Sequence, residues 1–228
     1  MIIRILTVLL IFSLLEEGNA QNAICNEWSL QERRELARNW KAELAESGLV
    51  VVMESNRRKM DYLQSQLEGN QELSKKRKVK ITEDLEKLRT ETLKKAEKTI
   101  EGFRKNFDFS EVFFIWDYNI RAILNQADTA VLLTDDLDYL DLSPFQSSDE
   151  IFFLIRGRAD RNSGRSGMQG FLIRNRALNP LCAPFPYFLS RNENNFFNVI
   201  FSIFKPDLYG EREMSQVAER FNSRLHAF

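Results

Sequence analysis

The chain has 228 residues, of which 43% are hydrophobic and 29% charged, and its formal net charge is −1. Such a composition is typical of a globular protein, and residues 21–228 suffice for one substantial domain. The near-neutral charge argues against a dedicated nucleic-acid-binding protein, which normally carries a clear excess of basic residues. After residue 20 no apolar run reaches the roughly 18 residues of a membrane-spanning helix, so we expect no membrane span there.

The first twenty residues have the organisation of a secretory signal peptide. Arg4 precedes an apolar run from Ile5 to Leu15, and Gly18 and Ala20 are small residues at the positions that a signal peptidase reads. The run is too short to span a bilayer as a helix, which needs about 20 residues. We therefore predict a signal peptide over residues 1–20 and a mature protein from Gln21 onward, either periplasmic or secreted.

Two cysteines, Cys25 and Cys182, remain in the mature chain. In an oxidising compartment an even number of cysteines permits a disulfide, and two unpaired thiols are the alternative. The bond would close a very long loop, for which the chain-entropy estimate is about 4–5 kcal/mol of stabilisation. We predict the Cys25–Cys182 disulfide.

The mature chain is predicted to begin with a helix and a buried strand. Leu36, Trp40 and Leu44 recur at steps of four residues between charged positions, which is the pattern of an amphipathic helix. The valine-rich run over residues 49–53 follows directly and predicts a buried strand.

A helical section is predicted over residues 56–107, inserted after this first strand. It comprises two helices around Gly69 and Asn70, and the second is a single long amphipathic helix. Such a pair can form a helical hairpin that projects as a coiled coil and binds a partner, or a cover for the sheet. The apolar stripe of the long helix consists of Ile81, Leu85, Leu88, Thr92, Ala96, Ile100, Phe103 and Phe107.

The second half of the chain is predicted to be mostly strands, with a short helix over residues 120–126 and a last helix from Glu213. Alternating strands and helices favour parallel strands first, whereas residues 151–155 and 170–173 resemble an antiparallel hairpin. We predict a single α/β domain over residues 21–228, with a mixed sheet of about five strands covered by helices. The other expected strands span residues 111–116 and 130–134, and 184–188 is a candidate edge strand.

The order of these features resembles a group of uncharacterised exported proteins from Bacteroidota. The resemblance implies export and a shared fold, and it lends no activity. It covers most of the mature chain and rests on the signal ending before Gln21, Asn39–Lys41 ahead of Gly48–Val51, Phe107–Phe109 leading into Val112–Phe114, Pro184–Tyr187 and Phe221–Leu225.

Catalytic motifs do not stand out in the sequence. The single histidine is His226, which argues against a Ser-His-Asp or Cys-His arrangement and against a zinc site of the usual composition. No glycine-rich phosphate-binding motif is present, and we predict no cofactor.

One cluster of carboxylates is a candidate metal site. Asp135, Asp136 and Asp138, with Asp141 beyond them, follow the run at residues 130–134, and Asp117 follows the run at 111–116. If both runs are neighbouring parallel strands, their carboxyl ends share one crevice, where carboxylates could hold Mg²⁺ or Ca²⁺. Ordinary turn-forming residues are the alternative.

Two basic groups are candidate anion-binding residues. Arginines on a polar loop can clamp a phosphate or a carboxylate, and a solvated hairpin end is the alternative. These arginines are Arg156, Arg158, Arg161 and Arg165, and the second group is the run Lys75–Lys78.

Three hypotheses on function therefore compete. The preferred one is a non-catalytic envelope protein that binds another protein, and it predicts exposed apolar residues on the outer face of the helix over residues 71–107. A metal-dependent hydrolase requires the carboxylates to converge in a pocket. A module for anionic glycans or lipid headgroups requires Lys75–Lys78 and the arginine loop to form one face.

Overall fold

The structure, a computed structural model, describes residues 28–69, 73–125, 131–140, 150–159, 167–191 and 212–228. The predicted signal peptide, Cys25, Asp141, Arg161 and Arg165 lie outside these residues.

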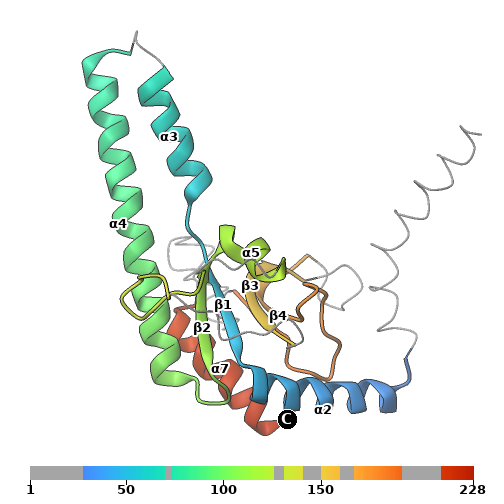
Figure 1. Cartoon of the computed structure of the whole chain (residues 1–228). Helices are drawn as coiled ribbons and strands as arrows, with labels where there is room; N and C mark the ends of the chain where they lie inside the picture. Colours follow the sequence, from blue (N-terminus) through green and yellow to red (C-terminus); the bar gives the residue numbers. More distant parts are fainter. Residues whose placement is uncertain (1–27, 70–72, 126–130, 141–149, 160–166, 192–211) are drawn as a thin grey trace, which may run out of the picture.

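A mixed sheet of five strands forms the centre of the fold, in the order β2-β1-β3-β4-β5 (Figure 1). β1 pairs in parallel with β2 on one side and β3 on the other, whereas β3–β4 and β4–β5 are antiparallel. The predicted α/β class, with parallel strands first and an antiparallel hairpin late, is confirmed. The strands are β1 Leu49–Met53, β2 Val112–Trp116, β3 Phe152–Arg158, β4 Gln169–Arg174 and β5 Phe188–Ser190.

Strand β1, which lies between β2 and β3, is apolar at every position because both faces of the sheet are covered there. Val51 and Met53 point into one core with Phe114 and Leu154, whereas Val50 belongs to a second core on the opposite face. Strands that are buried on two sides lose the alternation of polar and apolar residues, which explains the continuous valine-rich run.

Three helices cover one face of the sheet: α2 Leu30–Ser47, α4 Lys75–Asn106 and α7 Met214–Ala227. A capping box at Ser29 and Glu32 begins α2, and the four-residue spacing of α7 buries Val217 and Phe221 in the main core. The opposite face carries the short helix α5 Ile120–Leu124, which follows η1 Asp117–Asn119, together with Val131 and Leu132.

The predicted helical section is a hairpin of α3 Arg57–Gly69 and α4, and its far end projects beyond the sheet (Figure 1). No residue of α3 is buried, whereas the second half of α4 packs on the sheet and α7. The apolar stripe is correctly predicted in this half, where Thr92, Ala96, Ile100 and Phe103 are buried.

The expected strand at residues 130–134 is wrong. Val131, Leu132 and Leu133 are buried as predicted, but only Leu133 forms a bridge to β2, and that bridge to Phe114 is antiparallel. The chain turns back at once, because Thr134 and Leu140 donate backbone hydrogen bonds to Asp138 and Leu132. The expected edge strand also begins later, at Phe188, beyond the prolines that cannot donate to a ladder.

Gly102 allows the backbones of α4 and α7 to touch. A Cβ atom at this position would lie 2.7 Å from the backbone nitrogen of Ser215 and 3.0 Å from its Cα. We predict that Gly102→Ala separates the two helices and lowers the free energy of unfolding by about 1–3 kcal/mol, measured by urea denaturation.

The matched control is Gly69→Ala, because a Cβ there meets nothing within 4 Å. Alanine favours a helix by about 1 kcal/mol over glycine, so this variant should be no less stable than the wild type. Equal stability of the two variants would contradict the close backbone contact.

Candidate functional site

Asp117 lies at the carboxyl ends of two parallel strands, as predicted, and joins them. Its Oδ1 accepts hydrogen bonds from the Ser55 hydroxyl at 2.6 Å and the Ser55 backbone nitrogen at 3.2 Å. It also accepts one from the backbone nitrogen of Tyr118 at 3.0 Å. The carboxylate therefore ties the end of β2 to the residues that follow β1.

Asp135 lies at the opposite end of β2. It pairs with Arg104 of α4, whose Nη2 is 2.8 Å from its Oδ1 and whose Nη1 donates to the carbonyl of Val112 at 3.0 Å. Because the segment before it runs antiparallel to β2, the shared crevice with Asp117 does not form. Asp136 and Asp138 are exposed beside Asp135, and the part of the chain that the structure describes contains no cluster of three or more metal-ligating side chains.

The arginine candidates are only partly described. Nη1 of Arg156 on β3 lies 2.9 Å from Oε2 of Glu54, and Arg158 is exposed at the end of the same strand. Lys75–Lys78 instead lie at the far end of the hairpin, away from β3 (Figure 1). The structure therefore does not bring the lysine run and these two arginines together, and anion binding by the arginines stays a prediction.

An exposed cluster at the base of the hairpin was not predicted. We call Arg57, Tyr118 and Tyr139 the tyrosine patch. The hydroxyl oxygens of Tyr118 and Tyr139 are 2.8 Å apart, and the guanidinium of Arg57 lies 4.9 Å from the centre of the Tyr118 ring. Partial burial of the phenol, followed by the hydrogen bond and charge of Tyr139, raises the pKa of Tyr118 to about 12.

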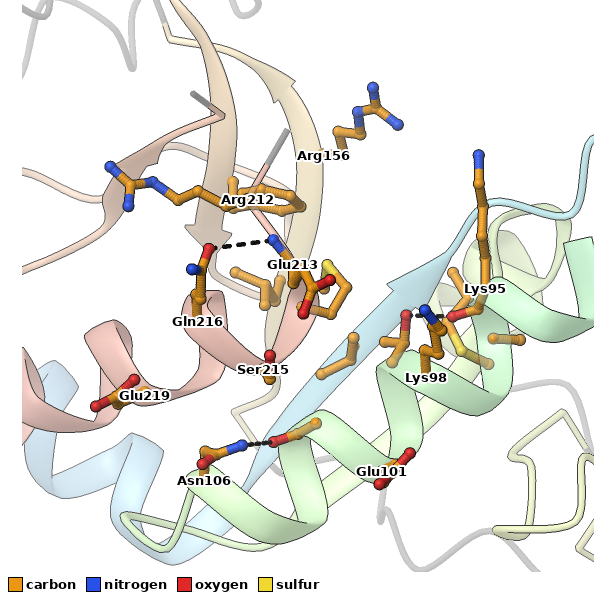
Figure 2. A pocket seen from close by; sticks show the side chains of 18 of the residues that line it. Lys95, Lys98, Glu101, Asn106, Arg156, Arg212, Glu213, Ser215, Gln216 and Glu219 are labelled. Atoms are coloured by element: carbon orange, nitrogen blue, oxygen red, sulfur yellow. Dashed lines mark hydrogen bonds between the residues drawn. The ribbon is translucent and has the colours of Figure 1, made fainter. Parts of the chain in front are cut away.

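A pocket of about 660 Å³ opens between the sheet, α4 and the start of α7 (Figure 2). It lies at the carboxyl end of β1 and beside the neighbouring strand β3. From β1 the chain continues to β2 on one side of the sheet, and from β3 it continues to β4 on the other. Ligands of open α/β sheets bind at such points of divergence, and the volume is that of a small-molecule site.

The pocket combines an apolar floor with a rim of both charges. Val51, Met53, Leu154 and Phe171 form the floor. Lys95 and Lys98 lie on the α4 side and Glu213 and Gln216 on the α7 side (Figure 2). Glu213 caps α7 in a capping box. A carboxylate of the chain itself therefore already interacts with the N-terminal end of this helix.

Sequence reasoning missed the pocket because no local motif marks it. Its wall comes from three strands and two helices that are distant in sequence, and only the strand order brings them together. The one available signal was the end of the 49–53 run, where a ligand crevice of a parallel sheet is expected.

His226 has a structural position near the protein surface. Its Nε2 lies 2.9 Å from Oδ1 of Asp108, which also accepts a hydrogen bond from Asn222 at 2.8 Å. The hydrogen bond from His226, then that from Asn222, lowers the pKa of Asp108. These contacts join α7 to the segment that enters β2.

Comparison with known proteins gives no relative. No family model, curated protein or solved structure matches the chain. Among the described residues, no helix has the length and apolarity that crossing a membrane requires.

Cys182 is buried, with 5% of its surface exposed. Because Cys25 lies outside the described residues, the disulfide stays a prediction.

We expect a reductant to lower the melting temperature of the wild type and to leave the melting temperature of Cys25→Ser unchanged, since the bond restricts the unfolded chain. Calorimetry with and without reductant tests this, and two free thiols in the untreated protein would contradict it.

The raised pKa of Tyr118 makes stability depend on alkaline pH. An unfolded tyrosine ionises near pH 10, so the stabilisation is complete below that pH and is lost as the pH rises towards about 12. Absorbance titration should show a phenol ionising near pH 12 that disappears in Tyr118→Phe.

The control is Tyr139→Phe, which removes the hydrogen bond and leaves the larger cause, burial, in place. In this variant the pKa of Tyr118 should fall without reaching its ordinary value. A titration identical in wild type and Tyr118→Phe would be incompatible with this arrangement.

Proposed function

We propose that the chain is a non-catalytic binding module, exported to the cell envelope, that engages another protein through the tyrosine patch and the α3–α4 hairpin. The observation that carries this proposal is the patch itself. Tyr118 and Tyr139 expose 41% and 47% of their surface, although both are aromatic.

The composition of the tyrosine patch supports a protein interface. Tyrosine and arginine are enriched among the residues that contribute most to binding energy. The patch is also ordered before any partner binds, because Tyr118 contacts both the Tyr139 hydroxyl and the Arg57 guanidinium. Side chains that are already fixed lose less conformational entropy on binding.

The hairpin supplies further exposed apolar side chains. Val79 and Leu93 on α4 expose 57% and 48% of their surface, which agrees with the expectation of the protein-binding hypothesis. Tyr62 on α3 is 62% exposed. The hairpin therefore offers a partner an arm whose apolar groups are not used by the core.

Export rests on the sequence. The signal-like residues 1–20, the resemblance to exported Bacteroidota proteins and the predicted disulfide all support a location outside the cytoplasm. Within that location the module would meet envelope proteins, which we propose as its partners.

The test replaces Tyr139 with a photoreactive phenylalanine analogue of similar shape in the source organism. Irradiation should yield a discrete cross-linked adduct with one other protein. Arg57→Ala in the same chain should reduce the adduct at least tenfold, since a residue of this kind contributes about 2 kcal/mol or more to binding.

Leu30 on α2 provides the matched control position, because it is 53% exposed and lies away from the patch. The analogue at Leu30 should give no adduct of the same mass. Identical adducts at both positions, or none at Tyr139, would show that the patch is not a protein-binding surface.

A further inference from the structure

The far end of the hairpin carries a dense group of positive charges. Five of the first six residues of α4 are basic, and we call them the basic tip: Lys75, Lys76, Arg77, Lys78 and Lys80. In Figure 1 this end of α4 is the part of the helix most distant from the sheet. The charges are therefore held away from the body of the domain.

The basic tip has no acidic partner in the described part of the chain. Lys75, Lys76, Arg77 and Lys80 are exposed and Lys78 is half-buried. The ion pairs that the described part of this helix makes lie further along, at Lys87 with Glu91, Arg89 with Glu86 and Arg104 with Asp135. Full charges at the tip thus face solvent.

The position of these charges is unfavourable for α4 on its own. The N-terminal end of a helix is the positive end of its macrodipole, and the first turn of α4 contains no acidic residue. Lys76 and Lys80 are also four residues apart, a spacing at which like charges repel. An anionic surface placed against the tip would relieve both effects.

The arrangement of the charges around the helix favours a flat surface over a groove. Successive residues of a helix are about 100° apart, so the five basic side chains encircle the end of α4. A protein that binds a helix usually contacts one face of it. A plane of lipid headgroups that meets the helix end-on can contact the basic side chains on all sides of it at once. Val79, which is 57% exposed, lies among these basic residues.

We propose that the basic tip adsorbs end-on to the surface of an anionic lipid bilayer. Clusters of four to eight basic residues bind such surfaces through the negative surface potential. The contact goes beyond the proposed protein binding, because it uses the opposite end of the hairpin from the tyrosine patch. It would hold the module at a membrane without any segment crossing it.

The test measures cosedimentation of the intact chain with vesicles of phosphatidylglycerol and phosphatidylcholine in equal parts, and with vesicles of phosphatidylcholine alone. The measured quantity is the ratio of the two affinities, so that any binding by residues 1–20 to neutral lipid cancels. We expect a preference for the anionic vesicles that declines as salt is added.

The tip variant carries Lys75→Gln, Lys76→Gln and Arg77→Gln. This variant should reduce the preference for anionic vesicles on the order of a hundredfold, because each of the three basic residues contributes to the attraction by an anionic surface. The control variant carries Lys87→Gln, Lys94→Gln and Lys98→Gln, which remove the same charge from the same helix and should retain most of the preference. Glutamine and lysine have similar helix propensities, so neither variant should melt at a lower temperature than the wild type.

Two results would overturn the proposal: equal binding of the wild type to both kinds of vesicle, or an equal loss in the tip and control variants. Soluble polyglutamate that binds through the tip as tightly as the vesicles do would assign the tip to an acidic protein instead. The cross-link at Tyr139 is measured separately, so failure here leaves the tyrosine patch independently testable.

Discussion

The contact between α4 and α7 at Gly102 determines how the rest of the molecule is arranged. α4 is a single helix of 32 residues, yet only its second half is buried against the sheet and α7. That half fixes the direction of the whole helix, and hence the position of the hairpin that α3 and α4 form. The same contact sets the width of the pocket, whose walls are α4, the start of α7 and the strands between them.

Periodicity predicted the elements of this fold well, because burial leaves a direct trace in the sequence. The stripe from Thr92 to Phe103 identified the buried side of α4, and the apolar run of β1 identified a strand covered on both faces. Such patterns report which residues are buried. They do not report the neighbour against which a segment lies, or in which direction.

The carboxylates illustrate that limit. Residues 131–133 were correctly expected to be buried, but an antiparallel bridge to Phe114 replaces the expected parallel strand and carries Asp135 to the far end of β2 from Asp117. The tyrosine patch and the pocket were missed for a related reason. Tyr118 and Tyr139 meet only because the chain folds back beside β2, and no spacing in the sequence encodes that return.

The hairpin separates two kinds of exposed surface by charge and by distance. Beside its base lie Tyr118 and Tyr139, which contact one another, whereas its far end carries exposed cations. α3, which begins at Arg57 of the tyrosine patch, spans the interval between them and is about 20 Å long at 1.5 Å per residue. A partner at the base and a charged surface at the far end could therefore be bound together without competing for space.

The placement of α7 has a consequence for the order in which the protein folds. Val217, Phe221 and Leu225 fill the same core as Ala37 and Leu44 of α2, and all five are completely buried. Residues at both extremes of the domain must therefore be present before the core can close. A chain in which only the sheet and the hairpin have formed still exposes apolar faces, and its core closes only once α7 has docked.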